Sequence, residues 1–213
     1  MKVLLVDDHP IFRRGVREIL QERPEIASVA EAEDGAAALH QLRVAEPDLA
    51  VFDIALPGHD GLELVAWCRD HAPGVECILL TMYDDPEYLE RALELGVRGY
   101  LLKDDTESEL DRCLETVLEG EVYVSPRFGR VRGALRPPPD PRAERMIATL
   151  SPAQRAVLAR VARFMTNREI AAELGLSHRT VENHRAHIAT RLGLEGANAL
   201  LRFAAQHAAW LGD

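Results

Sequence analysis

No apolar run in the sequence is long enough to cross a membrane. The first apolar run, Val3–Val6, ends at Asp7 and is too short for the core of a signal peptide. The chain has only three cysteines, Cys68, Cys77 and Cys113, and their spacing matches no metal site. So few thiols, in an odd number, are typical of a reducing compartment. We therefore expect a cytoplasmic protein with reduced cysteines and no membrane partner.

The charge of the chain is distributed unevenly. Its 213 residues suit one large domain or two ordinary ones, and 47% hydrophobic with 28% charged residues is typical of a folded globular protein. Residues 1–125 hold 11 Lys and Arg against 28 Asp and Glu, a net charge of −17, whereas residues 126–141 carry +3 and residues 142–213 carry +4. The two ends are therefore expected to have different partners, and the basic end is compatible with nucleic acid.

Apolar runs and helical patterns alternate over the first 120 residues. The apolar runs that predict strands are Lys2–Asp7, Ile26–Ala32, Leu49–Asp53, Cys77–Leu80 and Gly99–Leu102. The helical patterns that follow them are Pro10–Leu20, Asp34–Leu42, Leu62–Pro73, Pro86–Leu95 and Thr106–Leu118. This alternation predicts an α/β fold with a doubly wound, five-stranded parallel sheet of strand order 2-1-3-4-5 and helices on both faces.

The composition changes after Ser125. The stretch up to Pro141 holds four arginines and the run Pro137–Pro139, which favours an extended linker. The remaining residues show helical periodicity only, and the expected helices are Ala153–Phe164, Asn167–Leu174, His178–Leu192 and Ala197–Trp210. We therefore predict a first domain over residues 1–122, a linker over residues 123–144 and a small all-α domain of four helices over residues 145–213.

Polar residues stand at the carboxyl ends of the expected strands, where parallel sheets bind ligands. They are Asp7 and Asp8, Asp53, Thr81 and Lys103. Any one of them is more often a cap or a turn former, so the prediction depends on the whole set. Three carboxylates at one edge would repel each other unless a cation such as Mg²⁺ neutralised them. An Asp beside Mg²⁺, a Lys and a hydroxyl is equipped to accept a phosphoryl group as an acyl phosphate.

On these residues, the first 120 or so positions resemble the receiver domain of response regulators. The resemblance implies that a sensor histidine kinase phosphorylates Asp53 and that Lys103 pairs with the phosphoryl group. It also implies that Thr81 turns towards the phosphoryl group and that Tyr100 is the rotating aromatic of the switch. The metal would be Mg²⁺, and the resemblance assigns its ligands as Asp8, Asp53 and the carbonyl of Ala55 directly, with Asp7 acting through water.

The helices Asn167–Leu174 and His178–Leu192 flank Gly175 and Ser177, which suit the turn and the N-cap of a helix-turn-helix. Residues 150–194 resemble the DNA-binding domain of the NarL/FixJ (LuxR-type) regulators. The shared motifs are Leu-Ser-Pro, Asn-Arg-Glu-Ile-Ala, Leu-Ser-His-Arg-Thr-Val and Arg-Leu-Gly-Leu. The resemblance places Glu182, Asn183 and Ala186 towards base edges. Towards the phosphates it places Arg179, Thr180, His184, Arg185 and Arg191.

Both resemblances together imply a two-component response regulator that is not an enzyme. Phosphorylation would control transcription through binding to double-stranded DNA, with a homodimer forming on activation. One alternative is a phosphatase with an Asp nucleophile, but the second acid of such enzymes is replaced here by Ala55 after Asp53 and by His9 after Asp7. A second alternative keeps the receiver and uses the helical domain for protein contacts, which Glu182 on the expected recognition helix leaves open.

Overall fold

The computed structural model describes residues 1–82, 84–128, 141–208 and 211. They form two compact units, Met1–Tyr123 and Val124–Asp213. Among these residues, none of the helices combines the length and the hydropathy that a membrane span needs. Each unit is described by itself below.

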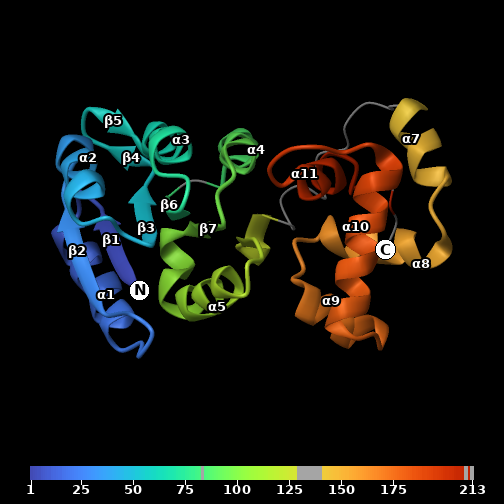
Figure 1. Cartoon of the computed structure of the whole chain (residues 1–213), viewed down its shortest axis with the longest axis horizontal. Coiled ribbons are helices and arrows are strands. Elements are labelled where there is room, and N and C mark those ends of the chain that lie inside the picture. The colour runs from blue at the N-terminus through green and yellow to red at the C-terminus, as the bar shows by residue number, and fades with distance from the viewer. Residues whose placement is uncertain (83, 129–140, 209–210, 212–213) are drawn as a thin grey trace. The chain divides into compact units, whose positions relative to one another are not determined.

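A parallel sheet forms the centre of the first unit (Figure 1). Its strands are β1 (Lys2–Val6), β2 (Ser28–Ala32), β3 (Leu49–Asp53), β6 (Glu76–Thr81), β7 (Gly99–Leu102) and the short β8 (Tyr123–Val124). The strand order is β2-β1-β3-β6-β7-β8, and the pairs among the first five strands are parallel. The expected order 2-1-3-4-5 is therefore confirmed, with β8 as an additional strand beside β7.

Helices cover both faces of this sheet. They are α1 (Pro10–Gln21), α2 (Gly35–Val44), α3 (Gly61–His71), α4 (Pro86–Leu95) and α5 (Thr106–Leu118). Figure 1 shows α1 and α5 on one face, and α2, α3 and α4 on the other. Strand side chains alternate between the faces, and the core on the α1 and α5 side includes Val3, Leu5, Val51, Leu80 and Leu101. Because both faces are covered, β3 is buried along its whole length, up to and including Asp53.

The helix boundaries follow local signals in the sequence. Pro10 and Pro86 occupy the first turns of α1 and α4, where the missing N–H costs no hydrogen bond. The side chain of Asp34 caps α2 by accepting from the N–H of Ala37 at 2.7 Å. Gly96 ends α4 in the left-handed conformation, at φ 91°.

A small hairpin follows β3 and was not predicted. Its strands are β4 (Ala55–Leu56) and β5 (His59–Asp60), paired antiparallel. Pro57 and Gly58 connect the two strands, with Gly58 at φ 74°. Two residues are too few for a strand pattern, so periodicity has no signal here.

The packing of α3 against the end of β3 depends on Gly61. A Cβ atom at this position would lie 2.3 Å from the carbonyl oxygen of Asp53 and 2.9 Å from the Cα of Ile54, which are backbone atoms that cannot swing aside. We expect Gly61→Ala to lower the free energy of unfolding by about 3 kcal/mol, as overpacking does. Denaturant unfolding measures this. In the control Gly15→Ala, no atom lies within 4 Å of the added Cβ, so stability should be unchanged or higher. Equal unfolding midpoints for Gly61→Ala and the wild type would contradict the packing argument.

The second unit is helical. Its helices are α7 (Pro141–Ala148), α8 (Pro152–Val161), α9 (Asn167–Leu174), α10 (His178–Leu192) and α11 (Ala199–Gln206). The boundaries expected for the two helices of the helix-turn-helix are confirmed, and those expected for its flanking helices differ by one to four residues where the structure describes them. The apolar faces of α8, α9 and α10 meet in a buried core that includes Val157, Val161, Ile170, Val181 and Ile188.

The structure differs from the expected linker at both of its ends. Tyr123–Val124 forms β8, where the N–H of Tyr123 donates to the carbonyl of Arg98 at 2.8 Å. At the other end, α7 is a helix in addition to the four expected, and its residues Ala143 and Ile147 lie one helical turn apart and form a buried apolar stripe. The proline run and Trp210 lie outside the described residues. The domain boundaries stay a prediction.

Candidate functional site

The predicted acidic site assembles at the carboxyl edge of the sheet. Asp7 directly follows β1, Asp53 ends β3, Thr81 ends β6 and Lys103 directly follows β7. Parallel pairing brings these ends together, since Asp53 aligns with Leu80 and Thr81 with Leu102. The four polar residues are almost fully buried, with exposed fractions of 0% for Asp7, 1% for Asp53, 2% for Thr81 and 7% for Lys103.

Lys103 connects the two buried carboxylates. Its Nζ lies 2.7 Å from Oδ2 of Asp7 and 2.7 Å from Oδ2 of Asp53, and 4.8 Å from the centre of the Phe12 ring. Burial raises the pKa of Asp53, against the lowering effect of Lys103, and the neighbouring charge of Asp7 raises it further. One ammonium shared by two carboxylates leaves an excess of negative charge, which a cation would offset.

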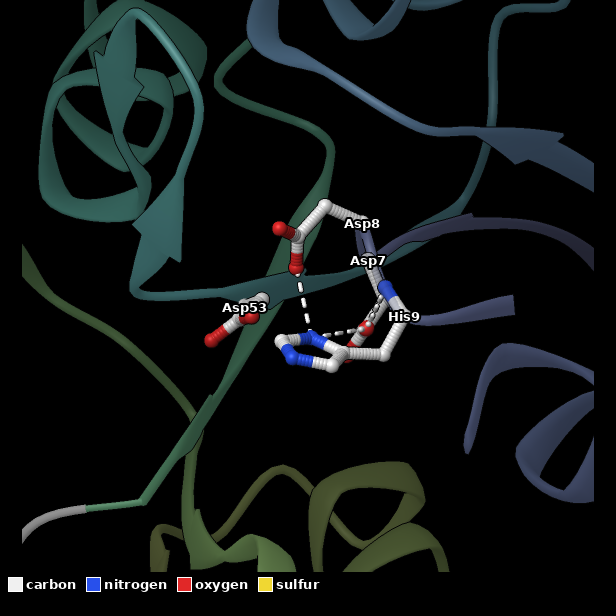
Figure 2. Close-up of side chains that lie close together, drawn as sticks. All are labelled: Asp7, Asp8, His9 and Asp53. Carbon is white, nitrogen blue, oxygen red and sulfur yellow. Dashed lines mark hydrogen bonds and ion pairs between the residues drawn. The ribbon is translucent and has the colours of Figure 1, made fainter. Parts of the chain in front are cut away.

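Asp8 and His9 are the more exposed residues of the acidic site, with 31% and 66% of their side chains exposed, and Figure 2 shows them next to Asp7 and Asp53. The Nδ1 atom of His9 is 2.6 Å from Oδ1 of Asp8 and 3.5 Å from Oδ1 of Asp7. One ligand atom from each of Asp7, Asp8, His9 and Asp53 falls within 4.8 Å of the others. Most of these donors are carboxylate oxygens, which are the ligands that Mg²⁺ prefers, so the residues fit the expected ion.

The structure adds residues that were not predicted for this site. His9 follows the acidic pair directly, and that adjacency is the signal that identifies it. Arg13 donates from Nη1 to the carbonyl of Asp7 and from Nε to Oε2 of Glu31 at 3.2 Å. Glu31 also accepts from Arg17 at 2.8 Å. This network ties the end of β1 to α1 and β2, and its partners are too far apart in sequence for a motif to reveal them.

The other predicted receiver residues are Ala55 and Tyr100. The N–H of Ala55 donates to Oδ1 of Asp53 at 3.1 Å. Tyr100 lies in β7 and is fully buried. Burial raises the pKa of its phenol well above the usual range, and the negative charge of Asp85 raises this pKa further. A surface pocket of about 400 Å³, lined in part by Ala55 and Thr81, opens next to the site.

The helix-turn-helix of the second unit has the expected geometry. Gly175 connects α9 to the turn at φ 66°, and the hydroxyl of Ser177 caps α10 by accepting from the N–H of Thr180 at 3.1 Å. Eight side chains of α10 are expected to approach DNA. Five of them are exposed, namely those of Arg179, Glu182, Asn183, Ala186 and Arg191. Those of Thr180, His184 and Arg185 are half-buried.

Three of these polar side chains have partners within the unit. The Thr180 hydroxyl lies 2.7 Å from that of Ser177, and Glu182 lies 3.8 Å from Nδ1 of His178. Arg185 donates from Nη1 to Oδ1 of Asn167 at 2.6 Å. The predicted set therefore does not form one uniform exposed surface.

Comparison with known proteins agrees with both units. Residues 3–115 match the family of response regulator receiver domains, and residues 148–204 match the bacterial regulatory proteins of the luxR family. The chain is 34% identical over 195 residues to the probable transcriptional regulatory protein NarL of Mycobacterium tuberculosis (strain CDC 1551 / Oshkosh). The matched residues make up 91% of this chain and 88% of that protein.

Solved structures of full length resemble the chain as well. The structure of the two-component response regulator RcsB-DNA complex is 28% identical, with a TM-score of 0.60 over 97% of this chain and 98% of that chain. The structure of two RcsB dimers bound to two parallel DNAs is 27% identical, with a TM-score of 0.59 over 97% and 98%. The family is one of transcriptional response regulators and not of classical enzymes, which argues against the phosphatase alternative. The chain therefore belongs to the response-regulator family, as a transcriptional response regulator with a receiver domain and a LuxR-type helix-turn-helix DNA-binding domain.

Proposed function

We propose that Asp53 accepts a phosphoryl group from a sensor histidine kinase and that this modification controls DNA binding by α10. The observation that carries the proposal is the buried pairing of Asp53 with Lys103 at 2.7 Å, at the edge where Asp7 and Asp8 add two more carboxylates. A structural ion pair would need no such excess of acid, whereas a phosphoryl acceptor that uses a cation does.

The contacts of Asp53 prepare its carboxylate for transfer. Oδ1 is oriented by the N–H of Ala55, and Oδ2 faces the ammonium of Lys103. In the transfer, an oxygen of Asp53 forms a bond to phosphorus while the phosphorus–nitrogen bond of the kinase phosphohistidine breaks and its electron pair returns to the imidazole. Lys103 then pairs with a phosphoryl oxygen while it keeps Asp7 as a second partner. The chain's contribution is positioning and charge stabilisation, as in other phosphoryl transfers.

Asp7, Asp8, Asp53 and the carbonyl of Ala55 are the groups that would hold Mg²⁺, with Asp7 acting through water. When bound, Mg²⁺ supplies positive charge next to the phosphoryl oxygens. Asp8 is the most accessible carboxylate of the set, with 31% of its side chain exposed.

Thr81 and Tyr100 are the proposed switch residues. The hydroxyl of Thr81 would turn towards the phosphoryl oxygens and so alter the surroundings of Tyr100. Tyr100 is fully buried in this structure. The buried side-chain position is therefore one of the two conformations whose populations phosphorylation would shift.

In the second unit, we propose that α10 enters the major groove and that the protein binds two half-sites as a dimer. Glu182, Asn183 and Ala186 would face base edges, and Arg179, Thr180, His184 and Arg191 would face phosphates. The likeness to RcsB structures solved with DNA supports this proposal. Arg185 differs from the other arginines because its guanidinium is bound to Asn167.

Operator selection with the phosphorylated and the unphosphorylated full chain tests the proposed function, with the oligomeric state measured in both samples. We expect the phosphorylated chain to enrich a paired half-site sequence as a dimer. Its affinity should fall steeply as salt is added, because bound phosphates release counterions. Equal enrichment by both forms would contradict phosphorylation control. Binding without salt dependence would favour the protein-contact alternative.

Glu182 offers a separate test of base readout. Its side chain is half exposed on α10, where its charge repels DNA phosphates. We expect Glu182→Gln to bind random duplex more tightly and to lose about 1–3 kcal/mol of discrimination at one base pair, since the carboxylate is a suitable acceptor for cytosine N4. Dissociation constants for the selected operator and its single-base variants measure this. Glu195→Gln, on an exposed residue beyond α10, is the control and should change neither quantity.

A further inference from the structure

The spacing of residues along α10 places Arg185 beside the buried face of the helix. Val181, Arg185, Ile188 and Leu192 follow each other at intervals of four, three and four residues, which is the spacing of one helix face. Val181 and Ile188 are fully buried and Leu192 nearly so. By contrast, Arg179 lies six positions before Arg185, so the two side chains point about 120° apart around the helix axis.

The guanidinium of Arg185 is engaged at the start of α9. Its Nη1 donates to Oδ1 of Asn167 at 2.6 Å, and Asn167 is the first residue of α9, with 6% of its surface exposed. The preceding residue, Thr166, caps α9 in a reciprocal arrangement with Glu169. Hydrogen bonds from a charged donor are the stronger ones in proteins. The bond therefore joins the capped N-terminus of α9 to the middle of α10.

We propose that Arg185 is a positioning residue that fixes α9 against the recognition helix and does not contact a DNA phosphate. The bond sets where α10 lies relative to the turn, and thereby the direction in which Glu182, Asn183 and Ala186 face. This inference rests on the proposed binding of DNA by α10. It changes the expected phosphate contacts: the exposed Arg179 and Arg191 would still contact phosphates, whereas Arg185 would not.

The test uses the full chain with five variants and two readouts. Arg185→Met keeps the aliphatic stem and removes the donor, Asn167→Ala removes the acceptor without changing charge, and a double variant combines both. Asn167→Asp keeps an acceptor at the same place, and Arg179→Met removes an exposed arginine of the same helix. The readouts are the salt dependence of binding to a random-sequence duplex and amide hydrogen exchange in α9.

Arg185→Met and Asn167→Ala are each expected to speed exchange in α9 about tenfold, the loss expected for one charge-assisted hydrogen bond. The double variant should exchange no faster than the faster single variant, and Asn167→Asp should behave as the wild type. The slope of log affinity against log salt should stay at the wild-type value for Arg185→Met. For Arg179→Met it should become shallower by about 0.9, the value for one lost phosphate contact.

Two outcomes would overturn the proposal. One is a slope that becomes as shallow for Arg185→Met as for Arg179→Met, which would make Arg185 a phosphate contact. The other is wild-type exchange in α9 of Arg185→Met, which would show that the bond fixes nothing. Failure of the wild-type chain to bind duplex DNA would count against the proposed function, and the exchange data would still decide whether the bond positions α9.

Discussion

Replacing Asp53 with asparagine is expected to abolish the uptake of a phosphoryl group from acetyl phosphate in the presence of Mg²⁺. The amide is neutral and lacks the anionic oxygen that attacks phosphorus. The one oxygen of the amide can still accept from the N–H of Ala55, and the ammonium of Lys103 keeps Asp7 as its partner, so the fold should persist. Intact mass measures the gain of one phosphoryl group in the wild type, and peptide mapping places it.

The matched control is Asp70→Asn. Asp70 is exposed on α3 and pairs with Arg69 at 2.8 Å, so its loss should leave phosphorylation at the wild-type level. A phosphoryl group on any residue of the Asp53→Asn variant, including Asp7 or Asp8, would contradict the assignment of the acceptor. Loss of phosphorylation in both variants would point to damage of the fold and not to the chemistry of Asp53.

The position of the acidic site could be predicted because each of its residues ends or directly follows an apolar run. Once those runs are assigned to neighbouring parallel strands, the sheet itself brings Asp7, Asp53, Thr81 and Lys103 to one edge. Side-chain direction does not follow from that argument. Neither the sharing of Lys103 by two carboxylates nor the contact of His9 with Asp8 is visible in strand order.

The second unit shows what a motif omits. Its pattern identifies α9, the turn and α10, because Gly175 and Ser177 act through local backbone geometry. The residue type of Arg185 and its place in the motif predict a contact with a DNA phosphate. Its position on the stripe of Val181 and Ile188 already predicts an inward direction, and the partner Asn167 appears only after the two helices are packed. The hairpin β4–β5 and the helix α7 lacked a sequence signal of comparable strength.

The second large effect concerns stability and the charge balance of the site. Lys103→Met is expected to lower the free energy of unfolding by about 3–5 kcal/mol at neutral pH, the cost of removing one partner from a buried ion pair. Methionine fills a similar volume but leaves the buried carboxylates of Asp7 and Asp53 without their shared cation. Denaturant unfolding measures the change. The chain has one other lysine, Lys2, which is exposed and donates to the carbonyl of Ala45 at 3.2 Å, so Lys2→Met is the control and should stay within about 0.5 kcal/mol of the wild type.

The pH dependence of the Lys103→Met variant identifies the charges responsible. Burial already raises the pKa of Asp53 above its ordinary value of 3.8, and Lys103 opposes that rise, so the variant should raise it further. A carboxyl whose pKa is higher in the folded state binds protons more tightly when folded, so stability increases as the pH falls through that value. The loss caused by Lys103→Met should therefore shrink as the pH falls from neutral towards the raised pKa of Asp53. Adding Asp53→Asn to Lys103→Met should recover stability at neutral pH, because one unpaired charge disappears. A loss that is independent of pH and unaffected by Asp53→Asn would show that Lys103 stabilises the fold through packing instead.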